Sequence, residues 1–326
     1  MRTLLEIENL VVHFDAEDGL IEVLDGITVT MSEGEVLGLV GESGAGKSVT
    51  ASAILGMIRR PGRILAGSIR LDGVDLLRLS EDEMGRYRGG RIAMIPQSPR
   101  TALNPLISVG RQISRLSEVH ERRSRAAARR RALEHLDLVG VADPERIVRE
   151  YPHQLSSGMC QRVMIAMALA SSPRLLIADE PTTGLDVSTA ARILDLLRHI
   201  SQGTGAAILL ITHDLGVVAQ TCHRVAVMHA GQLVETAPVR ELFRSPAHPY
   251  TRALLGSIPR IDIETKLQLV PGMVPSLRHP PTGCRYHNRC PHVVEICRCD
   301  KPRQIAVGQD HDVACFVFGE RRDAAA

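Results

Sequence analysis

Residues 41–48 read Gly41-Glu42-Ser43-Gly44-Ala45-Gly46-Lys47-Ser48, a complete G-x-x-x-x-G-K-[ST] phosphate loop. Its glycines free backbone N–H groups to wrap the phosphates of a nucleotide, while Lys47 reaches the β- and γ-phosphates and the Ser48 hydroxyl ligates Mg²⁺. The apolar run Val36–Val40 predicts a buried strand before the loop. The run Val49–Met57 predicts a helix after it, whose positive N-terminus points at the anion. The stretch therefore predicts an α/β fold that binds a nucleoside triphosphate.

The composition of the 326-residue chain, 44% hydrophobic and 23% charged, is that of a globular protein with one large or two smaller cores. A net charge of +2 and only 2% aromatic residues argue against a nucleic-acid partner. No apolar run approaches the ~18–20 residues that span a bilayer. The N-terminal segment Met1–Glu8 carries carboxylates where a signal peptide needs an apolar core. We therefore expect a cytoplasmic protein with reduced cysteines.

Four segments differ in composition. Residues 1–97 alternate short β-like runs with turns at Asp18-Gly19, Asp25-Gly26 and Asp72-Gly73. Residues 98–162 have helical propensity, and residues 163–235 return to the strand–helix alternation of a parallel sheet. Residues 236–326 are rich in proline and cysteine, which predicts a small appended domain. The basic run Arg122–Arg131 is interpreted as a solvated helix face, with Glu118, Glu121 and Glu134 as counter-charges.

Two carboxylates close a second apolar run, Leu175–Ala178. A buried strand there would deliver Asp179 to hold Mg²⁺ through water. Glu180, one residue on, is placed to polarise the water that attacks the γ-phosphate. The residues predict a helix over Ala190–Ser201 and a further strand over Ala207–Ile211.

Between these motifs, residues 155–162 read LSSGMCQR, which resembles the LSGGQ signature of ATP-binding-cassette (ABC) ATPases and precedes a helix expected from Arg162 to Ala170. The other elements of that family follow in order over residues 1–235. They are Phe14 (adenine-stacking loop), Gly41–Ser48, Gln97 (Q-loop), Ser156–Gly158, Asp179, Glu180, Gly184-Leu185-Asp186 (D-loop) and His213 (switch histidine).

The resemblance implies a P-loop NTPase (RecA-like) ABC nucleotide-binding domain, with residues 1–97 and 163–235 as its core and 98–162 as an inserted α-helical subdomain. It implies that Glu180, His213 and Gln97 are catalytic, and that Gln97 also contacts Mg²⁺. The expected nucleotide contacts are Phe14, Gly41, Ser43, Gly44, Ala45, Gly46, Lys47, Ser48, Val49, Asp179, Ser156, Gly158 and Asp186. The signature serine acts on the nucleotide of the opposite subunit, so two cassettes must close around two ATP molecules.

One position departs from the family pattern, which has two glycines where this chain has Ser157-Gly158. A Cβ at residue 157 would crowd the backbone approach to the partner's phosphate. The neighbouring Cys160, and Cys222, are interpreted as ordinary buried cysteines.

Further motifs resemble the peptide/nickel importer ATPases and, in the tail, the C-terminal extension of di- and oligopeptide permease ATPases. They are SPRTALNP at 98–105, YPHQ at 151–154, HPYTRALL at 248–255, VPGMVPS at 270–276 and GCRYHNRCP at 283–291.

The tail offers four cysteines, Cys284, Cys290, Cys297 and Cys315, with Cys299 as a spare. Their spacing, C-x₅-C-x₆-C-x₁₇-C, lacks the C-x₂₋₄-C pairs of zinc knuckles. It fits a Cys₄ [4Fe–4S] site at least as well as zinc, and free structural thiols are the third interpretation.

The resemblance implies the ATP-hydrolysing subunit of a peptide importer, peripheral on the cytoplasmic face of the membrane. Its partners would be a second homologous ABC ATPase, in a hetero- or homodimer, two transmembrane permease subunits and an extracellular substrate-binding protein. Import of nickel, glutathione or another small solute is the alternative. A DNA-acting clamp is disfavoured because residues 49–155 carry no heptad repeat. A non-hydrolysing ATP switch is disfavoured by Glu180 and His213.

Overall fold

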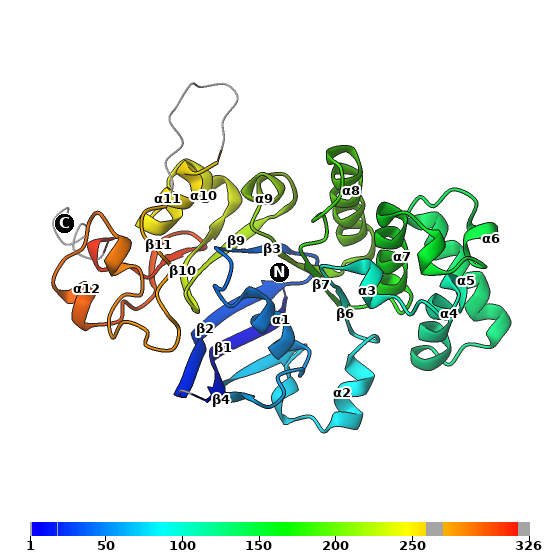
Figure 1. Ribbon diagram of the computed structural model, residues 1–326, viewed down its shortest axis with the longest axis horizontal. Coiled ribbons are helices and arrows are strands. Elements are labelled where there is room, and N and C mark those ends of the chain that lie inside the picture. The colour runs from blue at the N-terminus through cyan, green and yellow to red at the C-terminus, as the bar shows by residue number, and fades with distance from the viewer. Residues whose placement is uncertain (1, 18, 259–269, 319–326) are drawn as a thin grey trace. The chain divides into compact units, whose positions relative to one another are not determined.

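The computed structural model describes residues 2–17, 19–258 and 270–318 (Figure 1). The chain divides into two compact units. The first unit comprises Met1–Arg2, Ser32–Val36 and Arg78–Ile211, and the second comprises Thr3–Met31, Leu37–Leu77 and Thr212–Ala326. Residues 259–269 and 319–326 of the expected C-terminal extension lie outside the described residues.

A sheet with the strand order β2-β1-β4-β5 forms part of the second unit. Its strands are β1 (Thr3–Ala16), β2 (Gly19–Ser32), β4 (Gly62–Leu71) and β5 (Val74–Asp75), and β4 is antiparallel to both β1 and β5. The expectation of short strands is wrong for β1 and β2, which have 14 residues each.

Two of the expected turns of this segment lie on described residues. The turn at Asp72-Gly73 is confirmed, since both residues have positive φ, 52° and 79°, between β4 and β5. The turn at Asp25-Gly26 is wrong, because these residues lie within β2 and Gly26 alone takes φ 71° there. A glycine absorbs such a left-handed residue without ending the strand. Position 18 of the third turn is outside the described residues.

The second unit also holds the strand that enters the phosphate loop, β3 (Val36–Val40), whose five residues are all buried as expected. β3 runs parallel to β9 (Arg224–His229). Further antiparallel pairs join β9 to β10 (Gln232–Pro238), β10 to β12 (His311–Val313) and β12 to β11 (Ile305–Gly308). The proline-rich tail therefore adds strands to this sheet, which its composition did not predict.

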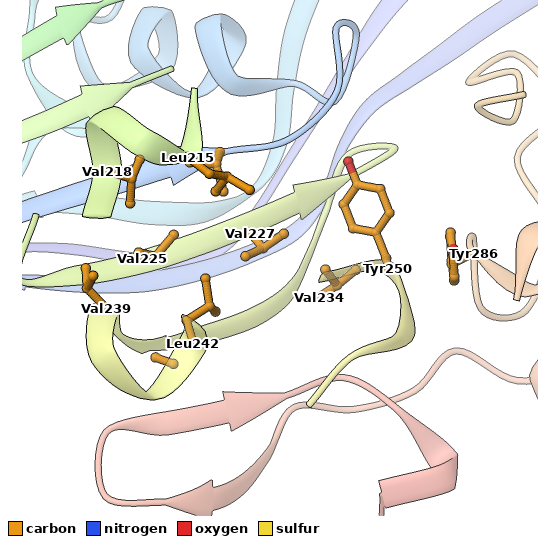
Figure 2. Packing of buried hydrophobic residues seen from close by; sticks show 11 residues of the cluster. Leu215, Val218, Val225, Val227, Val234, Val239, Leu242, Tyr250 and Tyr286 are labelled. Carbon is orange, nitrogen blue, oxygen red and sulfur yellow. The ribbon is translucent and has the colours of Figure 1, made fainter. Parts of the chain in front are cut away.

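A hydrophobic cluster covers β3, β9 and β10 (Figure 2). It combines side chains of β9 and β10 with those of α9 (Leu215–Thr221), α10 (Val239–Arg244) and α11 (Pro249–Gly256). Tyr250 and Tyr286 are fully buried members of the cluster, and their rings meet edge to face with centroids 5.4 Å apart. The cluster thus links the tail to the strands on which the phosphate loop is built.

In the first unit, three buried strands run parallel in the order β6 (Ile92–Ile95), β7 (Leu175–Asp179) and β8 (Ala207–Ile211). β7 and β8 are the strands expected from the apolar runs, and α8 (Val187–Thr204) between them extends beyond the expected Ala190–Ser201. The Ser201 hydroxyl of α8 donates to the carbonyl of Gly34 at 2.9 Å.

Helices occupy the segment between β6 and β7 (Figure 1). They are α3 (Pro99–Ala102), α4 (Val109–His120), α5 (Arg125–Leu138), α6 (Pro144–Ile147) and α7 (Ser157–Leu169). The expectation that the signature precedes its helix is wrong. α7 begins at Ser157, because the Ser156 side chain caps it by accepting the Met159 N–H at 3.3 Å.

The basic run belongs mostly to α5. Ion pairs join it to acidic neighbours: Arg123 with Glu121, Arg129 with Glu145 and Arg131 with Glu134. The third expected counter-charge, Glu118, pairs with Arg111 instead. Arg123 and Arg129 are exposed and Arg131 is half-buried, which supports a mostly solvated face. Across the described part of the chain, no helix combines the length and the apolar character needed to cross a membrane.

Candidate functional site

The phosphate loop joins β3 to α1 (Lys47–Ile54), which begins two residues earlier than the predicted helix. Gly46 caps α1 with φ 104°, and a Cβ there would lie 2.6 Å from Leu24 Cδ2. A Cβ on Gly41 would lie 2.2 Å from the carbonyl oxygen of Met228. Only glycine fits these two positions, because backbone conformation and contact both exclude a side chain.

The side chains of the loop are arranged to receive an anion. Lys47 Nζ donates to the carbonyls of Gly41 and Glu42 at 2.8 and 3.0 Å, which holds the ammonium over the loop. Gly44 has φ 81° and open space around the position of a Cβ. Ala45 is buried, Val49 is half-buried, and Ser43 and Ser48 are exposed. The Ser48 hydroxyl is the kind of hard oxygen ligand that Mg²⁺ takes.

Two further predicted residues belong to the second unit. Phe14 is half-buried near the end of β1 opposite Gly62, where a Cβ would come within 2.8 Å of the Phe14 ring. The ring therefore packs on a position where only a glycine leaves room for it. His213 is exposed in the turn after β8, next to Asp214, which caps α9.

In the first unit, the structure brings Gln97 and Glu180 together. Gln97 Nε2 donates to Glu180 Oε2 at 2.8 Å, and the Thr183 hydroxyl donates to the same oxygen at 2.9 Å. Glu180 has φ 48°, a left-handed conformation that non-glycine residues rarely adopt, and its N–H donates to the Ile211 carbonyl at 2.8 Å. Such a conformation persists only where the surrounding structure holds the residue in place, as these three hydrogen bonds do for Glu180. Asp179, the other predicted carboxylate, ends β7 and is buried.

Sequence reasoning missed Thr183. It lies in the segment Glu180-Pro181-Thr182-Thr183, three residues after Glu180, where its N–H also donates to the Glu180 carbonyl at 3.2 Å. A hydroxyl residue three positions after the carboxylate was the available signal. Thr183 fixes the rotamer of Glu180 together with Gln97.

The signature residues lie at the exposed N-terminus of α7. Ser156 and Ser157 are exposed, and a Cβ on Gly158 would lie 3.1 Å from Thr189 Cγ2 in α8. Asp186 caps α8, and its Oδ1 accepts the Ser188 hydroxyl at 2.7 Å and the Thr189 N–H at 2.9 Å. These hydrogen bonds, the one from Ser188 first, hold the pKa of Asp186 well below its usual range. Cys160 is fully buried, as expected, whereas Cys222 is only half-buried, although desolvation of its thiol raises its pKa to about 12.

Of the four tail cysteines, Cys297 and Cys315 are buried and Cys284 and Cys290 are half-buried. Burial raises the pKa of Cys284 to about 12, and charge on Cys297, Cys315 and Cys290 would raise it further. Backbone N–H groups of Tyr286, His292, Val317 and Phe318 point at three of the sulfurs. Such donors stabilise a thiolate ligand. Cys299 is exposed.

The chemistry of the four cysteines suits a centre that thiolates ligate. Their arrangement does not form a ready site for one metal ion. Within residues 2–17, 19–258 and 270–318, no three His, Cys, Asp or Glu side chains are grouped to hold one metal ion. A zinc ion needs all four sulfurs at ~2.3 Å from one point. An iron–sulfur cluster attaches its cysteines to separate irons and so accepts a wider arrangement.

Three features together define an ABC ATPase. The first is a phosphate loop that follows a buried parallel strand, the second is a Gln–Glu pair after another buried parallel strand, and the third is a signature helix capped by a serine. The profile described as "ABC transporter" matches residues 24–183, and "Oligopeptide/dipeptide transporter, C-terminal region" matches residues 234–297. The chain belongs to the ABC transporter ATP-binding proteins.

Individual relatives resemble it over nearly the whole chain. The probable peptide ABC transporter ATP-binding protein y4tR of Sinorhizobium fredii is 49% identical over 97% of this chain and 96% of its own. The oligopeptide transport ATP-binding protein AppD of Bacillus subtilis is 45% identical over 98% of both. The solved ATP-binding cassette MJ0796, a dimer bound to ADP and Pi, matches with a TM-score of 0.66 and 27% identity over 73% of this chain and 99% of its own.

Proposed function

We propose that this chain is the ATP-hydrolysing subunit of an importer of peptides. Hydrolysis is supported above all by the 2.8 Å hydrogen bond from Gln97 to Glu180, because nucleotide binding alone would need only the phosphate loop. The peptide class is supported by the C-terminal region profile on residues 234–297 and by relatives named for peptide transport.

Each site residue has a separate role in this proposal. Lys47 and the loop N–H groups of residues 43–49 bind the phosphates, and Phe14 stacks on the adenine. Glu180 accepts a proton from the attacking water, which Gln97 orients, and His213 donates to the γ-phosphate. Ser48 and Asp179, with Gln97, hold Mg²⁺. When bound, Mg²⁺ neutralises charge that develops on the phosphate oxygens.

Completion of the site in trans is part of the proposal. The exposed N-terminus of α7 presents Ser156 and Gly158 to the γ-phosphate held by a second ABC ATPase subunit, with Asp186 of the D-loop as a further contact. The remaining partners are two permease subunits and a substrate-binding protein, and the chain lies peripherally at the cytoplasmic side of the membrane. Residues 1–97 with 163–235 form the nucleotide-binding core, 98–162 the helical subdomain and 236–326 the extension.

A [4Fe–4S] cluster is the centre we propose for Cys284, Cys290, Cys297 and Cys315. Its support is the presence of four cysteines in one short segment, with a backbone N–H of His292 that donates to the sulfur of Cys290 at 3.4 Å. When bound, the cluster would supply four thiolate bonds that order this proline-rich segment, since ligation and folding are coupled.

Transport measurements in the native host test the function. Cells that lack this chain should lose uptake of labelled di- or oligopeptides, and the intact gene should restore it while the Lys47→Ala variant should not. Loss of nickel or glutathione uptake with normal peptide uptake would replace the peptide class by the alternative. ATP turnover by the purified complex that persists in Lys47→Ala would contradict the role of the phosphate loop.

A further inference from the structure

Glu42, the second residue of the phosphate loop, has all of its polar groups engaged. Its carboxylate oxygens accept hydrogen bonds from the two terminal nitrogens of Arg289 at 2.7 and 2.9 Å. Its N–H donates to the hydroxyl of Tyr250 at 3.0 Å. Its carbonyl accepts the Ala45 N–H at 3.2 Å and Lys47 Nζ at 3.0 Å. Two of these hydrogen-bond partners, Arg289 and Tyr250, belong to the C-terminal extension.

Arg289 is a buried, two-pronged partner for Glu42. Its side chain is 2% exposed, and Nε donates to the Pro271 carbonyl at 2.7 Å. Parallel N–H···O bonds of this kind fix orientation as well as distance. Burial would raise the pKa of Glu42, but the hydrogen bonds and charge of Arg289 outweigh it and hold that pKa below its usual value.

At neutral pH, the positive charge that balances the Glu42 carboxylate comes from Arg289 and not from the nearby His229. His229 Nδ1 lies 3.8 Å from Glu42 Oε2. Burial, assisted by the charge of Arg289, lowers the pKa of His229 to about 4, so this ring is neutral at pH 7. The ion pair between Glu42 and Arg289 is therefore electrically balanced.

Tyr250 is held in place by its neighbours. It is fully buried in α11, and its ring contacts His229 at 4.4 Å and Tyr286 at 5.4 Å between centroids. Figure 2 shows Tyr250 beside the aliphatic cluster that includes Val227 and Val234. A ring fixed on that cluster presents its hydroxyl to the loop without freedom to turn away.

We infer that Arg289 and Tyr250 are positioning residues for ATP, which hold Glu42 so that the following N–H groups of the loop are pre-arranged for the phosphates. The inference rests on the proposed ATP-binding function. A loop that is already ordered loses less conformational entropy when the nucleotide binds. The C-terminal extension is in this sense a structural part of the nucleotide site, in addition to any centre its cysteines hold.

The test measures binding of a fluorescent ATP analogue to the full chain and ATP KM in the assembled complex. Arg289→Met leaves the carboxylate of Glu42, a residue of the phosphate loop, without its cationic partner. Weaker ATP binding in this variant would therefore combine the effect of an unbalanced charge with the effect of lost positioning. The double variant Arg289→Met/Glu42→Gln restores the charge balance, and we expect its dissociation constant to remain about tenfold above that of the wild type. Tyr250→Phe changes no charge and should raise the constant about threefold. In each case KM should rise while kcat stays within about twofold.

Lys301→Met is the matched control. Lys301 also joins the extension to another part of the second unit, through an ion pair with Asp25 of β2 and not with a residue of the phosphate loop. We expect unchanged ATP affinity in this variant. If Arg289→Met does not fold, Arg289→Lys keeps the positive charge but cannot make two parallel hydrogen bonds to Glu42. This variant should show an intermediate loss of ATP affinity.

Two outcomes would overturn the inference. Wild-type affinity in the folded double variant would mean that only charge matters, and a lowered melting temperature with unchanged affinity in Tyr250→Phe would mean that the contacts serve stability alone. Failure of the wild-type chain itself to bind the analogue would count against the proposed function and not against the anchoring of Glu42.

Discussion

Glu180 combines a strained backbone with a side chain fixed by Gln97 and Thr183. Glu180→Gln retains an oxygen that accepts these hydrogen bonds but removes the base. We therefore expect unchanged ATP affinity and a ~10²–10⁴-fold lower kcat, the usual contribution of a positioned base. Single-turnover hydrolysis by the assembled complex measures this. Near-normal turnover with the substituted side chain would remove Glu180 from the role of base.

Ser157 offers a second residue-scale prediction, because it lies exposed in the first turn of α7 and no glycine conformation is required there. Its side chain is accommodated within its own chain, so any crowding falls on the nucleotide of the partner subunit. Ser157→Gly should raise the ATPase rate of the assembled complex, whereas Ser157→Ala, which keeps the Cβ, should not. An equal or lower rate in the glycine variant would show that the serine is tolerated at the composite site.

At the scale of elements, the sequence predicts most accurately the strands whose apolar run is followed by a charged or glycine-rich motif. β3, β7 and β8 occupy the expected residues because a buried parallel strand is apolar along its whole length. The start of α7 was not predicted, since the capping serine belongs to the signature itself. The length of β2 was missed because Gly26 bends the strand without ending it.

At the phosphate loop, two glycine substitutions distinguish the effect of backbone strain from the effect of a steric clash. Gly46→Ala must place a methyl group 2.6 Å from Leu24 Cδ2 in a left-handed residue, so we expect ATP binding to fall by at least about tenfold. Gly73→Ala is the control. Its φ of 79° imposes similar strain in the β4–β5 turn, with nothing near the new methyl group. It should lower the melting temperature and leave ATP affinity unchanged. Equal affinities in the two variants would contradict the steric argument.

The cysteine segment carries its own prediction. Protein purified without oxygen should be brown and contain iron and acid-labile sulfide, and serine at any of Cys284, Cys290, Cys297 or Cys315 should bleach it. Cys299→Ser should leave the colour intact, because this thiol is exposed and outside the group. Colourless protein with one zinc per chain would replace the cluster by zinc, and folded protein without metal would contradict both.

At the scale of the whole molecule, the limit of sequence reasoning is distance along the chain. Glu42 and Arg289 are 247 positions apart, and neither the loop motif nor the cysteine spacing indicates that they pair. The hydrogen bond between Gln97 and Glu180 spans 83 positions, and the sequence did not predict it either. The family resemblance gave both residues a role toward one water molecule, which implies a common site but not a direct contact. The pair of Glu42 and Arg289 has no such signal, because it depends on how the tail packs.

Assembly is the last property that follows from the molecule as a whole. The signature end of α7 is exposed, and a serine-capped helix N-terminus of this kind attracts an anion from outside its own chain. If that anion is the γ-phosphate of a second subunit, hydrolysis requires two cassettes. The ATPase rate per chain should then fall on dilution, and it should recover when the homologous cassette of the complex is added or the protein is concentrated. Ser156→Ala should lower the rate at saturating protein while ATP affinity of the isolated chain stays unchanged, because the loop of each chain binds its own nucleotide. A rate per chain that is constant over a hundredfold dilution, to concentrations at which light scattering shows monomers, would mean that one chain completes its own site.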